Sequence, residues 1–515
     1  MKKLNMLIYV SMLCLGTSCT GHFDELNTPE KFLSVDNLDA SLLGQAFAQC
    51  QYRGIMGDGS DLQQAQNLFS DLYAQYFATS VPWFNTDQYI HMGDWANWAW
   101  TAFYRDAAPQ LHFVEDYTVK NNMPVENALA KVWKVMIYHR MADQWGPIIY
   151  SQFGNAQTSV AYDAQQDIYM DFFRLLDEAS AVLSANAGGN AFGSNDLLYA
   201  GNVGKWLVFA NTLRLRLAVR LAYVAPEVAK QEAEKAVAAG VMELVADNAN
   251  LLTTDISRHP HEKISLWEEY RMSATMESVL KGYADPRLQV YFDPAVDGQQ
   301  YRGLRNGVET GDRTGVNSYY SAIGKKFHAL SQGGINPDIK VMGAAEAYFL
   351  RAEGALRGWN MGGSVNDLYN EGIRQSILAE TNASQADIEA YIHANRIPAS
   401  LNDKWNSPAV SDVPIAFQPS GDFEAQLEQI ITQKWIALFP DGWEAWSELR
   451  RTGYPARYPI VQSLDPEIPV DAIIRRLPFV PIEYQNNAAA VQHAVTLLGG
   501  GGDGRLVKVW WDAKP

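Results

Sequence analysis

Apolar residues recur at helical spacing along most of this chain, and this periodicity limits its fold more than any other feature. Within 126–145, Leu129, Trp133, Ile137 and Met141 lie four residues apart, so they share one face of a helix. The same spacing predicts four more helices, over 166–184, 204–223, 343–358 and 365–381. Because such helices follow one another in pairs with short links, the sequence predicts a mainly α fold. We expect an irregular helical array of tetratricopeptide-like pairs, roughly within 40–240 and 341–381.

Local signals mark the ends of some of these helices. Pro226 stands where the first residue of a further helix tolerates proline, and Gly240 ends that helix. Ser364 and Asp367 form a capping box at the start of the helix over 365–381.

Long segments without helical periodicity separate the predicted helices. The segments 247–270, 289–340 and 396–422 are rich in Gly, Pro, Asn and Ser. Connections of this length in a compact domain are usually either functional or disordered. We therefore expect a loop-rich second lobe, built from 247–340 and 396–422, to carry the specificity of the protein.

The N-terminus has the order of a lipoprotein signal. Two lysines at positions 2 and 3 precede an apolar stretch from Leu4 to Leu15, which is too short to span a bilayer. The small residues 16–18 then lead to Cys19. This order predicts a signal peptide over 1–18 and lipidation of Cys19 as the first mature residue. The alternative is ordinary secretion with an incidental cysteine.

The composition is that of an exported globular protein. Hydrophobic residues make up 47% of the 515 residues, which is enough for a large core, and the formal net charge is −17. So acidic a protein repels phosphate backbones, which argues against nucleic acid as a ligand. Apart from Cys14 in the signal and Cys19, Cys50 is the one remaining cysteine, so it has no partner for an intramolecular disulfide. We expect Cys50 to be a small buried residue on a helix.

The segment 433–455, QKWIALFPDGWEAWSELRRTGYP, specifies one short amphipathic helix. Asp441 can cap its start, with Glu444 closing a capping box, and Gly453 can end it. The cations Arg450 and Arg451 fall in its last turn, where they suit the helix dipole. One face is apolar, formed by Trp443, Trp446 and Leu449.

Together with four further sequence motifs, this segment resembles the SusD/RagB family of outer-membrane lipoproteins. One motif is IIRRLPFVPIEYQNN at 473–487, which holds Arg476, Pro478, Pro481, Glu483 and Asn487. The others are VWWD at 509–512, YADPRL at 283–288 and VMGAAEAYFLRAEGALRG at 341–358. The similarity is close over roughly the last half of the chain, with a C-terminal signature over 427–515, and looser before it.

The resemblance implies a SusD-like fold over 19–515, a single domain with four tetratricopeptide-like helix pairs. It implies a non-catalytic protein without a cofactor, held at the outer membrane by its lipid anchor and exposed at the cell surface. Such proteins capture nutrients, mostly glycans, for a SusC-like TonB-dependent transporter. It also implies that the tryptophan-rich helix near 443–449 is structural.

Aromatic residues mixed with amides and carboxylates indicate where a sugar would bind. Aromatic rings stack on the C–H faces of sugars, and the polar groups bind hydroxyls. Segment 83–104 holds eight aromatic residues in 22. By helical spacing, we expect Trp98, Trp100, Phe103 and Tyr104 to belong to the core. The candidate ligand residues are Trp83, Asn85, Tyr89 and Trp95 here, Trp267, Tyr270 and Arg271 in SLWEEYR, and Tyr319 and Tyr320 in NSYYSAIG.

Catalytic motifs are incomplete. HEKIS at 261–265 begins like a zinc helix but ends in Ser265 instead of histidine, and we interpret His259 and His261 as surface loop residues. Two alternatives to glycan capture stay open at this point. RagB-like members bind peptides, and 58 acidic residues leave room for the carboxylate pair of an all-helical exported glycoside hydrolase.

Overall fold

The computed structural model describes residues 40–515 except 297, 299 and 331–333. Residues 44–515 form the larger of the two units into which the chain divides. The predicted signal peptide and Cys19 lie outside the described residues.

Helices dominate the larger unit, which confirms the predicted mainly α fold. The predicted limits of α8, α9, α10, α11, α16 and α17 agree with the observed ones within three residues. The α-helices are α3 (Ala40–Gly54), α4 (Gly59–Leu62), α5 (Ser70–Tyr73), α6 (Gly93–Ala102), α7 (Ala108–Lys120), α8 (Pro124–Trp145), α9 (Gln165–Ala185), α10 (Val203–Arg220), α11 (Pro226–Ala239), α12 (Pro260–Ser265), α13 (Ala274–Gly282), α14 (Leu288–Tyr291), α15 (Arg313–Tyr319), α16 (Ala344–Leu356), α17 (Val365–Glu380), α18 (Gln385–Ile392), α19 (Phe423–Leu438), α20 (Gly442–Thr452), α21 (Pro481–Asn486) and α22 (Ala488–Thr496).

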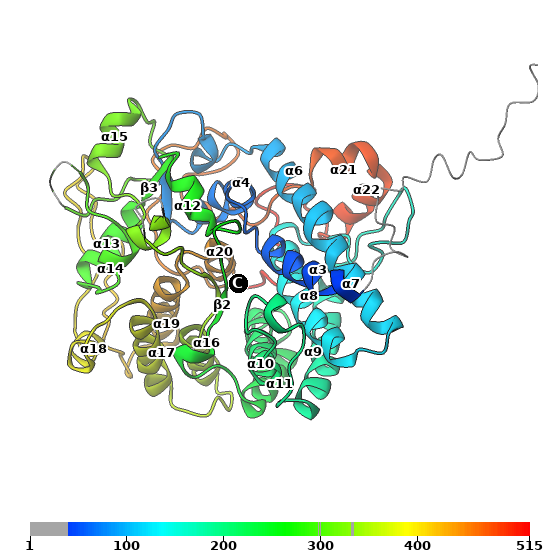
Figure 1. Ribbon diagram of the computed structural model, residues 1–515. Coiled ribbons are helices and arrows are strands. Elements are labelled where there is room, and N and C mark those ends of the chain that lie inside the picture. Colours follow the sequence, from blue (N-terminus) through cyan, green and yellow to red (C-terminus); the bar gives the residue numbers. More distant parts are fainter. Residues whose placement is uncertain (1–39, 297, 299, 331–333) are drawn as a thin grey trace, which may run out of the picture. The chain divides into compact units, whose positions relative to one another are not determined.

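Successive long helices pack as pairs. Helix α8 packs on α9, α10 on α11, and α16 on α17, and α10 also contacts α9 and α16 (Figure 1). The expected local signals are present, since Ser364 Oγ accepts a hydrogen bond from the Asp367 amide at 3.2 Å. Cys50 is fully buried on α3, as predicted.

The segments expected to be loops differ from one another. Segment 396–422, all of which is described, forms no helix or strand, as expected. Segment 247–340, in contrast, contains α12, α13, α14 and α15 together with β2 (Ala249–Leu251), β3 (Tyr270–Met272) and the start of β4 (Ile339–Met342). The short helices α12 and α15 have no apolar periodicity and depend instead on side-chain caps from His259 and Asp312. Strand β3 pairs antiparallel with β1 (Phe77–Thr79), and β2 pairs with β4.

His259 and His261 are buried, so the prediction that they are surface loop residues is wrong. Their rings lie 5.6 Å apart, and Phe327 from a distant loop packs against both. Burial lowers the pKa of His261 to about 3, so this ring is neutral at physiological pH. The Nδ1 atom of His261 lies 3.1 Å from the Tyr270 hydroxyl.

Helix α20 forms as the sequence predicts. Asp441 accepts a hydrogen bond from the Glu444 amide at its start, and Gly453 adopts a left-handed conformation at its end (φ 85°). The predicted apolar face of Trp443, Trp446 and Leu449 is buried. The Glu444 side chain, however, does not close a capping box; it turns to α10.

Charged side chains from α10, α16 and α20 meet in the protein interior. Arg220 is fully buried and donates to Glu444 at 2.6 Å and to Glu448 at 2.7 Å. Arg216, one turn earlier, donates through two nitrogens to Glu346 at 2.7 and 2.6 Å. We call the group formed by these five residues, together with Glu353, Lys434 and Arg451, the buried ion network.

Arg451 joins the network from the last turn of α20. It donates through two nitrogens to Glu353, both at 2.6 Å, and also to Glu448 at 2.6 Å. Lys434 on α19 places its Nζ 3.3 Å from Glu448. Arg450 lies beside the network with its guanidinium 3.8 Å from the centre of the Trp446 ring. Both arginines are therefore buried structural groups, and complementing the helix dipole is at most a small part of their role.

The network keeps the Glu444 carboxylate ionised despite its burial. Burial alone would raise the pKa of Glu444, but Arg220, Arg216 and Lys434 outweigh it and lower the pKa to about 2. The pKa of Glu444 is therefore below its unfolded value of 4.5. Its contribution to stability is present above that value and is lost as the pH falls toward 2.

Substituting Glu444→Gln should destabilise the protein strongly. The change leaves the buried cations Arg220 and Arg216 short of a counter-charge, and breaking a buried pair in this way costs about 3–5 kcal/mol. The matched control is Glu178→Gln, since Glu178 pairs with Arg174 and Lys131 at the surface. Exposed pairs contribute about 0–1 kcal/mol. Urea unfolding of both variants measures the difference, and equal losses would show that the network does not hold the fold.

Candidate ligand-binding surface

The three aromatic patches predicted from separate parts of the sequence are brought together by a short hydrogen-bonded ladder. Strand β1 pairs with β3, and on its other side β3 meets an extended segment, where the Met272 amide donates to the Ser321 carbonyl at 2.8 Å. The Ser321 amide in turn donates to the Arg302 carbonyl at 2.9 Å. The elements β3, α12 and α15 lie at the same end of the unit, at the upper left of Figure 1.

The first patch follows β1 and is the most exposed. Trp83 is 51% exposed, and Phe84 links it to Trp95 by edge-to-face contacts, with ring centroids 6.3 and 5.0 Å away. Asn85, next in the chain, is half-buried. Tyr89 does not join them, because its ring is buried and its hydroxyl donates to the Ala472 carbonyl at 2.9 Å.

The expectation that four aromatic residues of this segment belong to the core is wrong for Trp98. Trp100 and Phe103 are buried as expected, and Tyr104 is half-buried. Trp98 is instead 40% exposed, and its indole N–H donates to the Asp61 carboxylate at 2.9 Å. An indole N–H needs an acceptor, and Asp61 supplies one where α4 lies against α6.

The second patch combines one half-buried ring with two buried residues. Trp267 is half-buried, with the Lys263 ammonium 5.8 Å from its ring. Tyr270 is buried and points its ring edge at Phe77, with centroids 4.8 Å apart. Arg271 is also buried, but it lines an open cavity of about 380 Å³ between the end of α12 and residues 322–323.

The third patch lines a second cavity of similar size. Tyr319 is 44% exposed and meets Tyr320 edge to face at 5.0 Å. The Arg302 guanidinium lies 4.2 Å from the centre of the Tyr319 ring. Both tyrosines and Arg302 line a cavity of about 370 Å³ that also includes Asp403 and Lys404. The segment 320–323 therefore separates two cavities, each in the size range of small-molecule sites.

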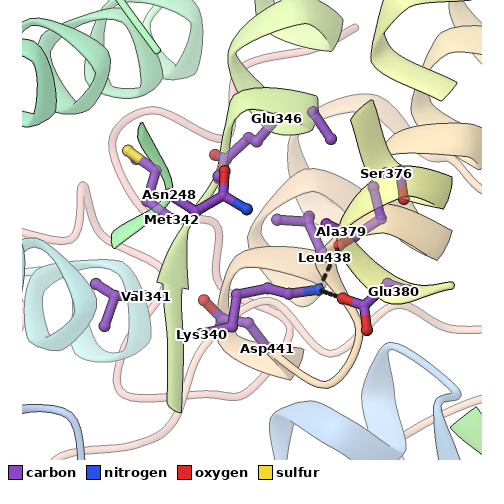
Figure 2. A pocket seen from close by; sticks show the side chains of 13 residues that line it. Asn248, Lys340, Val341, Met342, Glu346, Ser376, Ala379, Glu380, Leu438 and Asp441 are labelled. Carbon is purple, nitrogen blue, oxygen red and sulfur yellow. Dashed lines mark hydrogen bonds and ion pairs between the residues drawn. The ribbon is translucent and has the colours of Figure 1, made fainter. Parts of the chain in front are cut away.

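Other hollows in the described part of the chain are formed by different elements. One is a cavity of about 380 Å³ between α7 and α8, lined by Lys134 and Tyr150. Another is about 20 Å³, and Figure 2 shows Lys340 and Glu380 joined across it. The Lys340 Nζ lies 2.5 Å from the Glu380 carboxylate. Although burial raises the pKa of Glu380, Lys340 and Lys326 lower it to about 2. The small cavity has room for about one water and holds a paired charge, so it is structural.

Phe84, Arg302 and Glu268 also belong to this surface, although no sequence pattern singles them out as candidates. Phe84 lies within the aromatic run, and its role as the link between two tryptophans appears only in the packing. Glu268 has a left-handed backbone (φ 54°), held because its carbonyl accepts hydrogen bonds from Ser80 Oγ at 3.2 Å and Asn317 Nδ2 at 2.8 Å. No local sequence signal predicts such a turn, because the hydrogen-bond donors that hold it come from two distant segments.

The surface offers aromatic faces, carboxylates and guanidinium groups, which together suit a polyhydroxylated ligand. Throughout the described ranges, no group of three or more His, Cys, Asp or Glu side chains is placed to hold a metal ion. None of the helices in the described part of the chain combines the length and apolar character that a membrane crossing requires.

Comparison with known proteins places these features in a family. The family model described as "SusD-like: Susd and RagB outer membrane lipoprotein" matches residues 25–512. A solved chitin-binding SusD homologue from Flavobacterium johnsoniae is 36% identical, with 92% of this chain and 99% of that chain covered and a TM-score of 0.86. A SusD homologue from Bacteroides thetaiotaomicron is 33% identical, with 93% and 100% covered and a TM-score of 0.84. A further structure, described as a chitin-binding protein, is 29% identical, with 92% and 100% covered and a TM-score of 0.76. No curated protein matches the chain.

Trp83 and Tyr89, six residues apart, should differ in their effect on stability. Trp83→Ala removes a half-exposed ring, so the free energy of unfolding should change by about 0.5 kcal/mol or less. Tyr89→Ala empties a buried site and leaves the Ala472 carbonyl without its donor, at a cost of about 3 kcal/mol or more. Thermal unfolding of both variants decides the matter: a Trp83→Ala protein that melts as early as Tyr89→Ala would place Trp83 in the core.

Proposed function

Because the chain belongs to the SusD-like family of outer-membrane lipoproteins, we propose that it captures chitin-type oligosaccharides and delivers them to a SusC-like TonB-dependent transporter. SusD-like proteins bind their ligands without cleaving them, so the chain is a glycan-binding outer-membrane protein and not an enzyme. The identity of the sugar, the residues that bind it, the partner transporter and the position at the cell surface are all part of what we propose.

One observation carries the proposal: exposed aromatic rings lie beside open cavities that are also lined by charged and polar side chains. Trp83 and Tyr319 are both more than two-fifths exposed, although large aromatic side chains are usually buried. A cluster of such rings beside cavities marks an interaction surface. Flat rings bind the C–H face of a sugar, and the nearby carboxylates and guanidinium groups bind its hydroxyls.

The choice of chitin rests on relatives. Two structures with similarity over nearly the whole chain are described as chitin-binding. The surface described above has the aromatic faces that a long β-linked chain can stack on at several points. The alternative of a peptide cargo has no such support, and it becomes an outcome of the binding experiment.

The purified protein should bind chitohexaose and leave it intact. Titration calorimetry measures affinity, and chromatography of the sugar after incubation detects cleavage. Trp83→Ala should weaken binding by roughly 1–2 kcal/mol, the size of an aromatic contact. The matched control is Phe423→Ala, because Phe423 is 37% exposed at the start of α19 and lies outside this surface. Binding of peptides but of no glycan would contradict the proposal, as would release of shorter sugars.

Lipidation of Cys19 is the second part of the proposal, and it predicts membrane attachment. Two or more buried acyl chains, at about 0.8 kcal/mol per methylene, anchor a protein firmly where one chain does not. Cys19→Ala should therefore move the protein from the membrane fraction to the soluble fraction, while Cys14→Ala, a change within the predicted signal, should not. Labelled palmitate that still enters the Cys19→Ala protein would show that the anchor lies elsewhere.

A further inference from the structure

Arg271 is a buried cation whose hydrogen-bonding capacity is only partly used. The side chain is 4% exposed, and Nη1 donates to the Tyr270 carbonyl at 2.8 Å. Nη2 lies 3.9 Å from the Glu268 carboxylate, beyond hydrogen-bonding distance, and the buried Nε has no partner. Burial lowers the pKa of Arg271 to about 10, so the group is still charged at neutral pH. A charged donor without an acceptor is costly, and a ligand atom that accepts from Nη2 removes that cost.

The backbone holds Arg271 at the cavity wall. In the β1–β3 ladder Arg271 pairs with Ala78, while Tyr270 and Met272 on either side are buried. Side chains alternate along a strand, so Tyr270 and Met272 share one face and Arg271 takes the other. Arg271 lines the 380 Å³ cavity described above, and its position is fixed by the strand rather than by a flexible loop.

The rest of this cavity combines apolar and acidic groups. Ile323 forms a buried apolar part of the lining, and Leu266 also lines it although 62% of its side-chain surface is exposed. Glu268 is held at the cavity by its left-handed turn, with a side chain that is 57% exposed. Asp293 also lines the cavity and lies 3.5 Å from His328.

These groups select among the substituents that a sugar can carry. A carboxylate would suit Arg271, but Glu268 and Asp293 in the same cavity would repel it. A hydroxyl on the same ring carbon reaches less far than the carbonyl oxygen of an acetamido group, so it would leave both the guanidinium and the apolar wall of Leu266 and Ile323 unused. An acetamido group has a carbonyl acceptor, an N–H donor and a methyl group, so it uses the guanidinium, the carboxylate and the apolar wall together.

We infer that this cavity is the subsite that recognises the N-acetyl group of a bound sugar. Arg271 donates to the acetamido carbonyl oxygen, the Glu268 carboxylate accepts from the acetamido N–H, and the methyl group packs on Ile323 and Leu266. The inference rests on the proposed capture of chitin-type sugars and adds the residues that distinguish them from other β-linked glucans. Without the acetyl group, Arg271 is left with its unmet donor, which disfavours the unacetylated sugar.

The test compares chitohexaose with cellohexaose, which has the same linkage but hydroxyls in place of acetamido groups. Calorimetric titration of the full protein should show about tenfold or greater preference for chitohexaose. Arg271→Met should reduce this preference to about threefold or less while cellohexaose affinity changes about twofold or less. Leu266→Ala, at an exposed position that folding does not depend on, should reduce it by about threefold. Arg174→Met, on the exposed face of α9, is the matched control and should leave the preference unchanged.

The outcomes separate this inference from the proposed function. If the unaltered protein does not bind chitohexaose, both the proposed function and the N-acetyl subsite are wrong. If it binds, but folded Arg271→Met keeps the acetyl preference or weakens both sugars equally, the proposed function stands and the N-acetyl subsite is overturned. If Arg271→Met does not fold, Leu266→Ala decides, and an unchanged preference in that variant overturns the subsite.

Discussion

The fold depends on charged groups that are buried where charges are costly. Arg220 lies fully buried between Glu444 and Glu448, and Arg451 joins Glu448 to Glu353. The buried guanidinium groups of Arg216, Arg220 and Arg451 are tolerable because each donates to a carboxylate on another helix at hydrogen-bonding distance. The network therefore accepts one arrangement of α10, α16, α19 and α20, whereas apolar side chains alone would tolerate several. A buried network of this kind specifies geometry more than it adds stability.

That geometry reaches the ligand surface through α19. Lys434 on this helix faces the network, and the next residue, Trp435, donates to the Ala74 carbonyl at 2.9 Å and accepts on its own carbonyl from the Tyr76 hydroxyl at 2.6 Å. The Tyr76 carbonyl in turn accepts from the Ser273 amide at 3.2 Å. Tyr76 immediately precedes β1, and Ser273 immediately follows β3. These contacts therefore connect both strands to α19. The loops that carry the exposed rings and the two cavities extend from this anchored ladder.

The sequence predicts what local pattern determines. The long helices follow from apolar spacing, and the cap of α20 follows from Asp441, because both depend on neighbours a few residues away. The expectations that are wrong concern residues with distant partners. Phe327 packs on His259 and His261, which are buried, and Asp61 accepts a hydrogen bond from the exposed Trp98. The candidate site divides in the same way. Aromatic composition finds its three patches, but only the β1–β3 ladder shows that they are neighbours. That Tyr89 belongs to the interior follows only from the burial of its ring.

The central claim is that one surface, formed by the segments that follow β1 and surround β3 and α15, binds a chitin-type sugar. Hydrogen–deuterium exchange of the full protein with and without chitohexaose tests it directly, because backbone amides beneath a bound sugar exchange more slowly. The account predicts slower exchange in 80–95, 265–272 and 317–323, with no change in α7 and α8. Slower exchange confined to the cavity between α7 and α8, with none in those three segments, would contradict it.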